Sequence, residues 1–417
     1  MKRFVIVLLV LFLAAGCVVG YVVARNANTA RTPVQPSGVQ EQAEPEQSEQ
    51  SEQSEQTPTE TEEEPAVSVG RIDYEAIRAL HEPDEVVGNV DGRDVTWDEY
   101  FYWICSIGSQ AQDYIDTMAM YGQSLDWTDK LSAESEQTFA EYVVSLVNDS
   151  VREVSTVEAV AGEVGAELSE EDLAAIAEQV RQDIADTCGE DASEEDFNAF
   201  LAEKNITRTM YDRLNEVNFL YRNGFKKLYG EQGADVDDET ALGYLQENGY
   251  ISATHILLMT IDSQTREALD DETVAQKQAQ AEELAAELRA IDDVETLLAR
   301  FAELKEQYCE DTGKEKFPDG YLFTPGTMVT EFEDAVNALE EYEVSEPIKT
   351  SFGYHVIMRL PLNADMAVDF SDDGSPLTAR ALYANASYNE LMTDRIEASV
   401  LTLYGELESF DLMDYIK

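Results

Sequence analysis

Two of the chain's three histidines, His255 and His355, stand in apolar stretches whose composition favours β-strands. A neutral imidazole has one donor and one acceptor nitrogen, so two facing rings could share hydrogen bonds and set each other's tautomers. The hydroxyl of Thr350, just before His355, could join this network. A buried structural pair and a directly catalytic pair are both compatible with these residues. A metal site is disfavoured because no third ligand stands at metal-site spacing.

Three apolar side chains in the same region could form a surface for a ring-shaped group. Met328 and Phe332 are four residues apart, which places them on one face of a predicted helix. Phe323 precedes them and could form a wall beside that face. The alternative is that these side chains are ordinary core residues.

The elements that must position these residues alternate between strand and helix. Hydrophobic periodicity and turn residues predict, in order, a strand, two helices, a strand, a helix and two strands. The clearest segments are a strand at 251–258, a helix at 274–289, a helix capped by Asp292 or Asp293, and strands at 345–348 and 350–359.

Three motifs in this region resemble those of the parvulin family of peptidyl-prolyl isomerases, in the same order. They are His255-Ile256-Leu257, residues 326–335 (GTMVTEFEDA) and residues 348–357 (IKTSFGYHVI). The resemblance covers 250–361 and implies a parvulin-like four-stranded sheet-and-helix domain that needs no metal and no cofactor. It implies that four residues are catalytic: His255, Asp311, Thr350 and His355. It also implies that three residues bind the substrate: Phe323, Met328 and Phe332. Cys309 fits the family's acid-or-thiol position less well than Asp311.

The implied reaction is rotation about the bond that precedes a proline. That rotation breaks amide resonance against a barrier of about 18–20 kcal/mol. No covalent step is needed, because a site that holds the ring, excludes water and favours the twisted amide lowers the barrier.

Two segments depart from the family. Residues 317–323 (FPDGYLF) carry Gly320 where a pocket leucine is usual, so a chaperone with an inactive parvulin fold is the alternative function. The loop 260–272 has a single basic residue, Arg266. Selectivity for phosphorylated substrates is therefore not expected, because phosphate recognition uses clustered cations.

The sequence before this region predicts a hairpin followed by helices. Residues 87–96 (VGNVDGRDVT) resemble the opening of the chaperone domain in the SurA/PrsA foldase group. Thr96 is expected to cap the next helix, with Glu99 completing a capping box. Further helices are expected at 139–160 and 206–229, with caps at Ser169 and Ser193.

After the parvulin-like region, residues 376–405 predict a long helix, and residues 413–417 are expected to fray. In the resembled group this C-terminal segment completes the chaperone domain. The expected fold class is therefore α+β, with a parvulin-like domain inserted in a discontinuous helical SurA/PrsA-like chaperone domain.

The N-terminus predicts export. Lys2 and Arg3 precede an apolar run from Phe4 to Ala24 that is long enough to cross a bilayer, and the basic residues favour a cytoplasmic N-terminus. The segment 13–17 (LAAGC) also resembles a lipobox, so a lipid anchor at Cys17 stays open. Both interpretations place the chain at a bacterial cell membrane, facing the extracytoplasmic side.

A low-complexity spacer follows. Between Gln40 and Glu64 there are ten Glu and no Lys or Arg, a composition that favours an extended, disordered chain. The expected organisation is an anchor at 1–25, an acidic spacer at 26–70, the N-terminal part of the chaperone domain at 71–249, the isomerase domain at 250–361 and the C-terminal helix at 362–417.

The composition of the chain limits the classes of molecule that it is expected to bind. The formal net charge is −58, which disfavours nucleic acid because phosphate binding needs basic clusters. Neutral or basic polypeptides are the better partners, and the resemblance implies unfolded exported polypeptides with X–Pro bonds. A structural cell-envelope role has only the anchor and spacer in its favour. Besides Cys17 the chain has three cysteines, an odd number, at widely spaced positions: Cys105, Cys188 and Cys309. Neither a disulfide framework nor a zinc site is therefore indicated.

Overall fold

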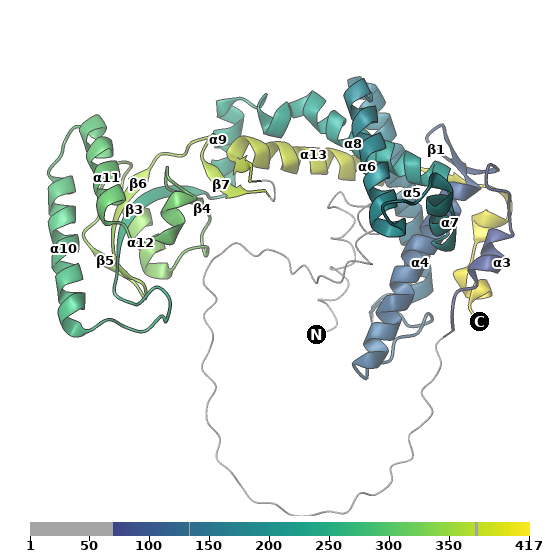
Figure 1. Ribbon diagram of the computed structural model, residues 1–417, viewed down its shortest axis with the longest axis horizontal. Coiled ribbons are helices and arrows are strands. Elements are labelled where there is room, and N and C mark those ends of the chain that lie inside the picture. The colour runs from purple at the N-terminus through teal and green to yellow at the C-terminus, as the bar shows by residue number, and fades with distance from the viewer. Residues whose placement is uncertain (1–69, 133, 372–373) are drawn as a thin grey trace, which may run out of the picture. The chain divides into compact units, whose positions relative to one another are not determined.

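The computed structural model describes residues 70–417 except 133, 372 and 373 (Figure 1). The predicted anchor, Cys17 and the acidic spacer before residue 70 lie outside this part of the chain. Within it, no helix combines the length and the apolar character needed to cross a membrane. The described residues divide into two compact units: unit 1 comprises 70–228 and 388–417, and unit 2 comprises 229–387.

Unit 1 consists mainly of helices. Thr138, Ser169 and Ser193 each begin a helix with a complete capping box, which confirms the two predicted serine caps. The helices are α3 (Tyr74–Arg78), α4 (Trp97–Met120), α5 (Phe139–Val164), α6 (Glu170–Cys188), α7 (Glu194–Glu203) and α8 (Arg208–Tyr229).

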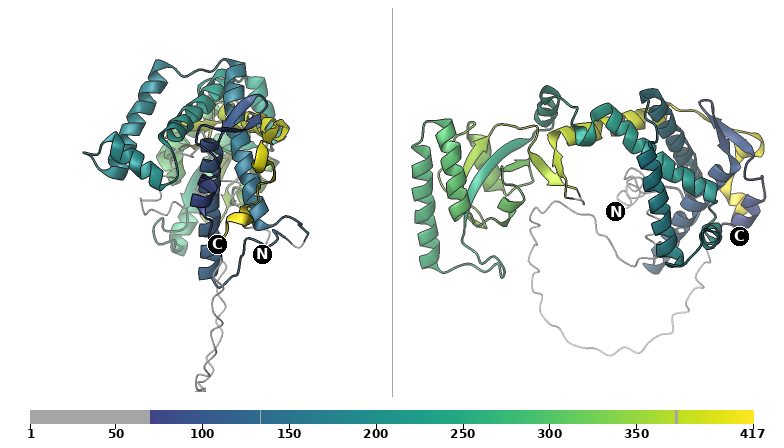
Figure 2. Two further views of the ribbon diagram at one scale, coloured as in Figure 1. Left: turned by 90° about the vertical axis from the view of Figure 1, so that its right-hand side faces the viewer. Right: turned by 45° about the horizontal axis from the view of Figure 1, so that its top comes forward.

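Unit 1 also contains a small antiparallel sheet with strand order β2-β1-β9. The hairpin β1 (Val86–Val90) and β2 (Arg93–Thr96) confirms the prediction; its turn places Asp91 and Gly92 at positive φ, as tight hairpin turns require. The third strand, β9 (Leu401–Leu403), comes from the C-terminal segment and pairs with β1, so unit 1 is discontinuous in sequence (Figure 2).

The capping box predicted at Thr96 is wrong. The Thr96 side chain makes no cap hydrogen bond. Glu99 is only 1% exposed and accepts two hydrogen bonds of 2.8 Å from Arg93, with Arg213 at 3.2 Å. A buried carboxylate needs cationic partners, and that requirement prevails over the local cap.

The C-terminal predictions need two corrections. The helix α13 is shorter than expected and spans Ala379–Ala398; Pro376 lies instead in a hairpin formed by β7 (Ala367–Phe370) and β8 (Pro376–Thr378). The end of the chain is not frayed, because Lys417 and Arg71 exchange backbone hydrogen bonds of 2.7 and 2.9 Å. In both places tertiary pairing overrides the local pattern.

Unit 2 contains the predicted order of strands and helices around a four-stranded antiparallel sheet with strand order β4-β3-β6-β5. The elements are α9 (Asp238–Glu247), β3 (Ile251–Met259), α10 (Asp271–Arg289), α11 (Val294–Tyr308), β4 (Tyr321–Phe323), α12 (Thr330–Ala338), β5 (Ile348–Lys349) and β6 (Gly353–Leu360), followed by the β7–β8 hairpin and the start of α13. The expected α+β class is confirmed.

The sheet of unit 2 is covered on both faces. Helices α10 and α11 pack on one face, where Ile256, Leu258 and Val356 meet Leu284 and Phe301. The single helix α12 packs on the other face in a smaller cluster: Ala253, Phe323, Phe332, Val336 and Ile357 (Figure 1). The two histidines are on the face covered by α12, which determines what surrounds them.

Candidate active site

The two central strands of unit 2 bring His255 and His355 together. In the β3–β6 ladder His255 is opposite Ile357 and Leu257 is opposite His355, so both rings are on the same face of the sheet. The ring centroids are 5.1 Å apart with the planes at 70°, and the residues are 7% and 5% exposed. The predicted hydrogen bond between the imidazoles is absent; each ring has a different polar neighbour.

His355 is held by Thr350. The Thr350 Oγ1 atom lies 2.9 Å from His355 Nε2 and also accepts the Phe352 N–H at 3.1 Å. Because the hydroxyl already accepts one hydrogen bond, it can donate its own proton to Nε2, which favours a neutral ring protonated at Nδ1. Burial and the neighbouring His255 lower the pKa of His355 from 6.5 to about 3. The ring is therefore uncharged near neutral pH.

His255 faces a carboxylate. Its Nε2 atom lies 3.2 Å from Asp311 Oδ2, an ion-pair distance whose alignment does not make a regular hydrogen bond. Asp311 also accepts the Gly313 N–H at 2.9 Å and the Tyr321 hydroxyl at 2.5 Å. Burial by itself raises the pKa of Asp311, but His255, Tyr321 and Gly313 outweigh it and hold that pKa far below its usual value.

Tyr321 is a site residue that sequence reasoning does not find. Its ring stacks on His255 with centroids 5.6 Å apart and an interplanar angle of 6°, while its hydroxyl donates to Asp311. Burial and this hydrogen bond raise the pKa of Tyr321 far above its usual value, so the hydroxyl stays protonated. In the sequence it shows only as a tyrosine two residues before Phe323, which gives no signal of a polar site residue.

A buried lysine holds the loop that leads to Tyr321. Lys305 is 9% exposed, and its Nζ donates to the Pro318 carbonyl at 2.9 Å and to Thr254 Oγ1 at 3.2 Å. Burial lowers its pKa. The loop also needs Gly320, whose φ is +111° and where a Cβ would stand 2.7 Å from the Ala253 carbonyl oxygen. A leucine at position 320 would therefore clash with β3.

Phe332 joins the apolar residues to the histidines. Its ring makes edge contacts with His255 at 5.3 Å and His355 at 5.6 Å, and its centroid is 6.0 Å from that of Phe323. Both phenylalanines are 3% exposed, so they form the base of the site. Met328 packs against the same cluster but is only half-buried, which makes it the accessible member.

The predicted placement of Met328 on a helix is wrong. It lies in the bend before α12, which begins at Thr330. Glu333 fixes this bend: its carboxylate accepts the Gly326 N–H at 2.9 Å and the Met328 N–H at 2.8 Å. The motif residue Glu333 is therefore a positioning residue for Met328.

Cys309 has a structural environment. Its sulfur accepts the Leu257 N–H at 3.4 Å, and the side chain is in the cluster formed by α10, α11 and the sheet. Burial raises the pKa of its thiol. The Cys309 thiol therefore stays protonated and is expected to be unreactive, because the thiolate is the reactive form.

Comparison with known proteins matches this region to one family. The family model described as "Rotamase: PPIC-type PPIASE domain" matches residues 255–360. "Foldase protein PrsA 1" of Bacillus cereus is 43% identical over 100 residues, which are 23% of this chain and 35% of that protein. "Foldase protein PrsA" of Halalkalibacterium halodurans is 35% identical over 132 residues, which are 30% of this chain and 32% of that protein.

Among solved structures, PrsA from Bacillus subtilis is 17% identical, with 64% of this chain and 88% of that chain covered and a TM-score of 0.25. The parvulin NmPin of Nitrosopumilus maritimus is 31% identical, with 27% and 97% covered and a TM-score of 0.18. The chain spans about a third of the length of the two curated relatives, 35% and 32%. Residues 255–360 of this chain therefore match the PPIC-type, or parvulin-type, family of peptidyl-prolyl isomerase domains and are similar to part of the PrsA foldases.

Proposed function

We propose that residues 250–361 catalyse cis–trans isomerisation of X–Pro bonds in exported polypeptides, and that the helical unit chaperones their folding. The observation that carries this proposal is the packing of Phe332 against both His255 and His355, beside the half-buried Met328. An apolar base next to neutral and ionised polar groups suits a prolyl ring joined to an amide.

The apolar residues would bind the ring. The prolyl ring would contact Met328 directly, with Phe332 and Phe323 beneath it. Burying a side chain of this size contributes about 1.5–3 kcal/mol, which is enough to hold the ring while the amide rotates. Withdrawing the amide from water favours the twisted state, because the planar amide is the more polar form.

The polar residues would act by fixed electrostatics, because rotation needs no proton transfer. Thr350 and Asp311 fix the orientations of the two imidazoles, and Tyr321 holds Asp311 in place. The Nδ1 atoms of both histidines are buried and have no hydrogen-bond partner among the described residues. These two nitrogens would therefore be available to hydrogen-bond with a bound amide.

The test is the exchange rate of an Ala-Pro test peptide measured by NMR with catalytic amounts of the full chain. Met328→Ala is expected to slow the catalysed exchange by about tenfold or more, since about 1.4 kcal/mol of lost binding is a factor of ten. Met328 is preferable to Phe332, whose truncation would cost about 3–5 kcal/mol of stability.

Val274→Ala is the control, because Val274 is a half-buried residue of α10 and packs against the cluster on the other face of the sheet. Its exchange rate is expected to match that of the unmodified chain. Equal rates for Met328→Ala and the unmodified chain would contradict the proposed site.

A holdase without isomerase activity is the second candidate. The stacked Tyr321 favours it because the ring covers one side of His255. This candidate predicts that the chain suppresses aggregation of an unfolded protein and leaves the proline exchange rate unchanged.

We further propose that the chain is held at the extracytoplasmic side of a bacterial membrane. Support comes from Lys2, Arg3 and the apolar run 4–24. A retained transmembrane helix and a lipid on Cys17 predict different mature N-termini. Mass spectrometry of the mature protein separates them: an intact Met1 supports the helix, and a lipidated Cys17 supports the lipid anchor.

A further inference from the structure

The sheet of unit 1 has two different edges. The edge strand β2 carries Arg93 and Asp94, and charged residues are a common protection against pairing with another chain. The other edge strand, β9, has the sequence Leu401-Thr402-Leu403, without charge or proline. Its flanking residues Val400 and Tyr404 are 61% and 43% exposed. By composition, β9 is the edge suited to accept a further strand.

The register shows which backbone groups of β9 face outward. Tyr404 N–H donates to the Val87 carbonyl at 2.9 Å, and Thr402 is opposite Asn89. Hydrogen-bonded and non-hydrogen-bonded pairs alternate in an antiparallel ladder, so Thr402 also bonds to β1. The N–H and C=O groups of Leu401 and Leu403 therefore point away from β1, toward the free edge.

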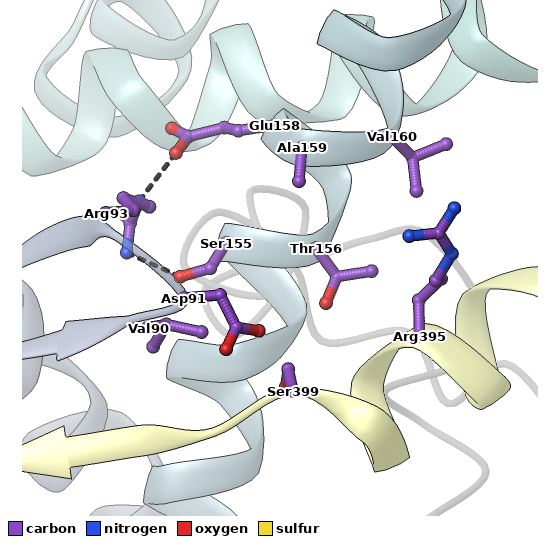
Figure 3. Close-up of a pocket in the computed structure, with 10 residues that line it drawn as sticks. All are labelled: Val90, Asp91, Arg93, Ser155, Thr156, Glu158, Ala159, Val160, Arg395 and Ser399. Atoms are coloured by element: carbon purple, nitrogen blue, oxygen red, sulfur yellow. Dashed lines mark hydrogen bonds and ion pairs between the residues drawn. The ribbon is translucent and has the colours of Figure 1, made fainter.

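A groove runs beside this strand. One cavity of about 760 Å³ is lined by all of β9 and by Ser145, Asn148, Asp149 and Arg152 of α5. A second cavity of about 310 Å³ lies between the same helix and the β1–β2 hairpin (Figure 3). Its lining includes Ser155, Thr156 and Ala159 of α5 and Val90, Asp91 and Arg93 of the hairpin. Ser399, at the turn between α13 and β9, lines both cavities.

Apart from Glu158 and Val160, the helical residues that line the two cavities form a single stripe, spaced by three or four residues from 145 to 159. At 1.5 Å per residue this stripe is about 21 Å long. An extended chain rises about 3.3 Å per residue, so about six residues of extended polypeptide would fill it. A large globular partner would not fit between one strand and one helix.

The charges of the groove indicate which polypeptide it suits. Its arginines already have carboxylate partners: Arg93 with Glu99 and Glu158, Arg395 with Glu163, and Arg152 with Asp149. An acidic segment would therefore find no unpaired arginine among these lining residues. Two copies of the chain would repel each other, since each carries a formal charge of −58.

We propose that an extended, neutral or basic segment of unfolded polypeptide binds in this groove and adds a strand to the free edge of β9. The inference rests on the proposed role in folding exported polypeptides but concerns a site distinct from the isomerase site. Main-chain pairing requires N–H groups in the bound segment, so this groove would select proline-poor stretches, whereas the isomerase site would act on X–Pro bonds.

The test is fluorescence anisotropy with the full chain and a short fluorescein-labelled peptide of alternating Val and Lys residues. The unmodified peptide is expected to bind. The same peptide N-methylated at alternate backbone nitrogens is expected to bind about tenfold more weakly or worse, because it cannot pair with the strand. Equal binding of the two peptides, or no binding of the unmodified one, would overturn the proposal.

Two pairs of variants locate the site. Leu403→Pro removes an outward N–H and is expected to weaken binding about tenfold, whereas Leu403→Ala removes the side chain, keeps the N–H and should bind within about twofold. If Leu403→Pro fails to fold, Ser145→Trp, which fills the groove, is compared with Ser145→Ala. Full binding by Leu403→Pro or Ser145→Trp would overturn the proposal.

Two further measurements separate the alternatives. Sedimentation measures whether the chain forms a dimer. If Leu403→Pro dissociates a dimer and leaves peptide binding unchanged, the edge of β9 pairs with a second copy of the chain, and the proposal is overturned. Proline exchange measured on the same variants is expected to be unchanged. If the unmodified chain has no isomerase activity, that result would count against the proposed function, whatever the outcome of peptide binding.

Discussion

At the scale of single residues, the site places two chemically different histidines side by side. His355 is neutral because burial and the neighbouring His255 lower its pKa, and Thr350 supplies one hydrogen bond to its ring. His255 faces the ionised Asp311, which Tyr321 and Gly313 stabilise in its charged form. In the proposed isomerisation the pair would offer fixed dipoles to the amide, and no proton would have to move.

The buried neutral His355 makes the sheet of unit 2 sensitive to acid. Its pKa is about 3 in the folded protein against 6.5 for an unperturbed histidine. Between these values the unfolded chain binds the proton and the folded chain does not, so stability falls as pH drops from 6.5 toward 3. The slope is up to about 1.4 kcal/mol per pH unit for one proton. Asp311 adds a further loss only below its ordinary value of 3.8.

Amide hydrogen exchange of β3 and β6 measures this effect, since it reports the local stability of the strands. His355→Gln keeps a polar group for Thr350 but does not titrate, and it should show a clearly smaller pH dependence between 6.5 and 4. The same slope in both proteins would show that His355 is not the titrating group.

Residue-level prediction from sequence succeeds where a motif fixes both type and place. The β-rich residues around His255 and His355 correctly predict two strands, and the resemblance of their motifs to the parvulin family implies the four-stranded sheet that brings the strands together. Tyr321 escapes prediction because its contacts with His255 and Asp311 arise from the path of a loop. That path depends on Gly320 and on the buried Lys305, neither of which has a periodic signal.

At the scale of elements, α12 positions the accessible apolar residue through one carboxylate. Glu333 accepts hydrogen bonds from the backbone N–H groups of Gly326 and Met328 and so fixes the bend before the helix. Glu333→Ala is expected to loosen that bend and to raise KM for a proline peptide several-fold, since Met328 would no longer be preorganised. A second consequence is faster amide exchange at Met328.

Glu331→Ala is the control for this prediction, because Glu331 is exposed on the first turn of the same helix. It changes the charge of α12 equally and should leave KM within about twofold, as surface substitutions usually do. If both variants raised KM alike, the effect would come from helix charge and not from the bend.

Helices and caps that depend on local periodicity can be predicted from the sequence. A strand that forms only by pairing with a segment far away in the chain cannot. The caps at Ser169 and Ser193 are local and were predictable. Strand β9 is not, since residues 401–403 continue an apolar helical pattern and become a strand only by pairing with β1. Met328 has helical spacing relative to Phe332, yet the hydrogen bonds to Glu333 keep it in the bend before the helix.

At the scale of the whole molecule, unit 1 is completed by the C-terminal segment. Leu407 and Leu412 are 2% and 1% exposed, and the last residue pairs with Arg71. Burying two leucines contributes about 3–6 kcal/mol, comparable with the total stability of many domains. Deleting residues 400–417 should therefore unfold unit 1 at a much lower temperature.

Tryptophan fluorescence follows this unfolding selectively, because all three tryptophans, Trp97, Trp103 and Trp127, are in unit 1. Amide exchange in β3 and β6 should be unchanged by the deletion. The exposed substitution Glu408→Ala serves as the control and should leave both signals as they are. A truncated chain with an unaltered tryptophan transition would show that unit 1 does not need its C-terminal segment.

Proline exchange in a test peptide, measured as a function of the concentration of the unmodified chain, decides whether this protein is an isomerase. The cis–trans exchange rate is expected to rise in proportion to that concentration, with the chain far below the peptide in amount. An exchange rate equal to that of the free peptide at every concentration, from a chain that is folded and still prevents aggregation, would contradict this expectation.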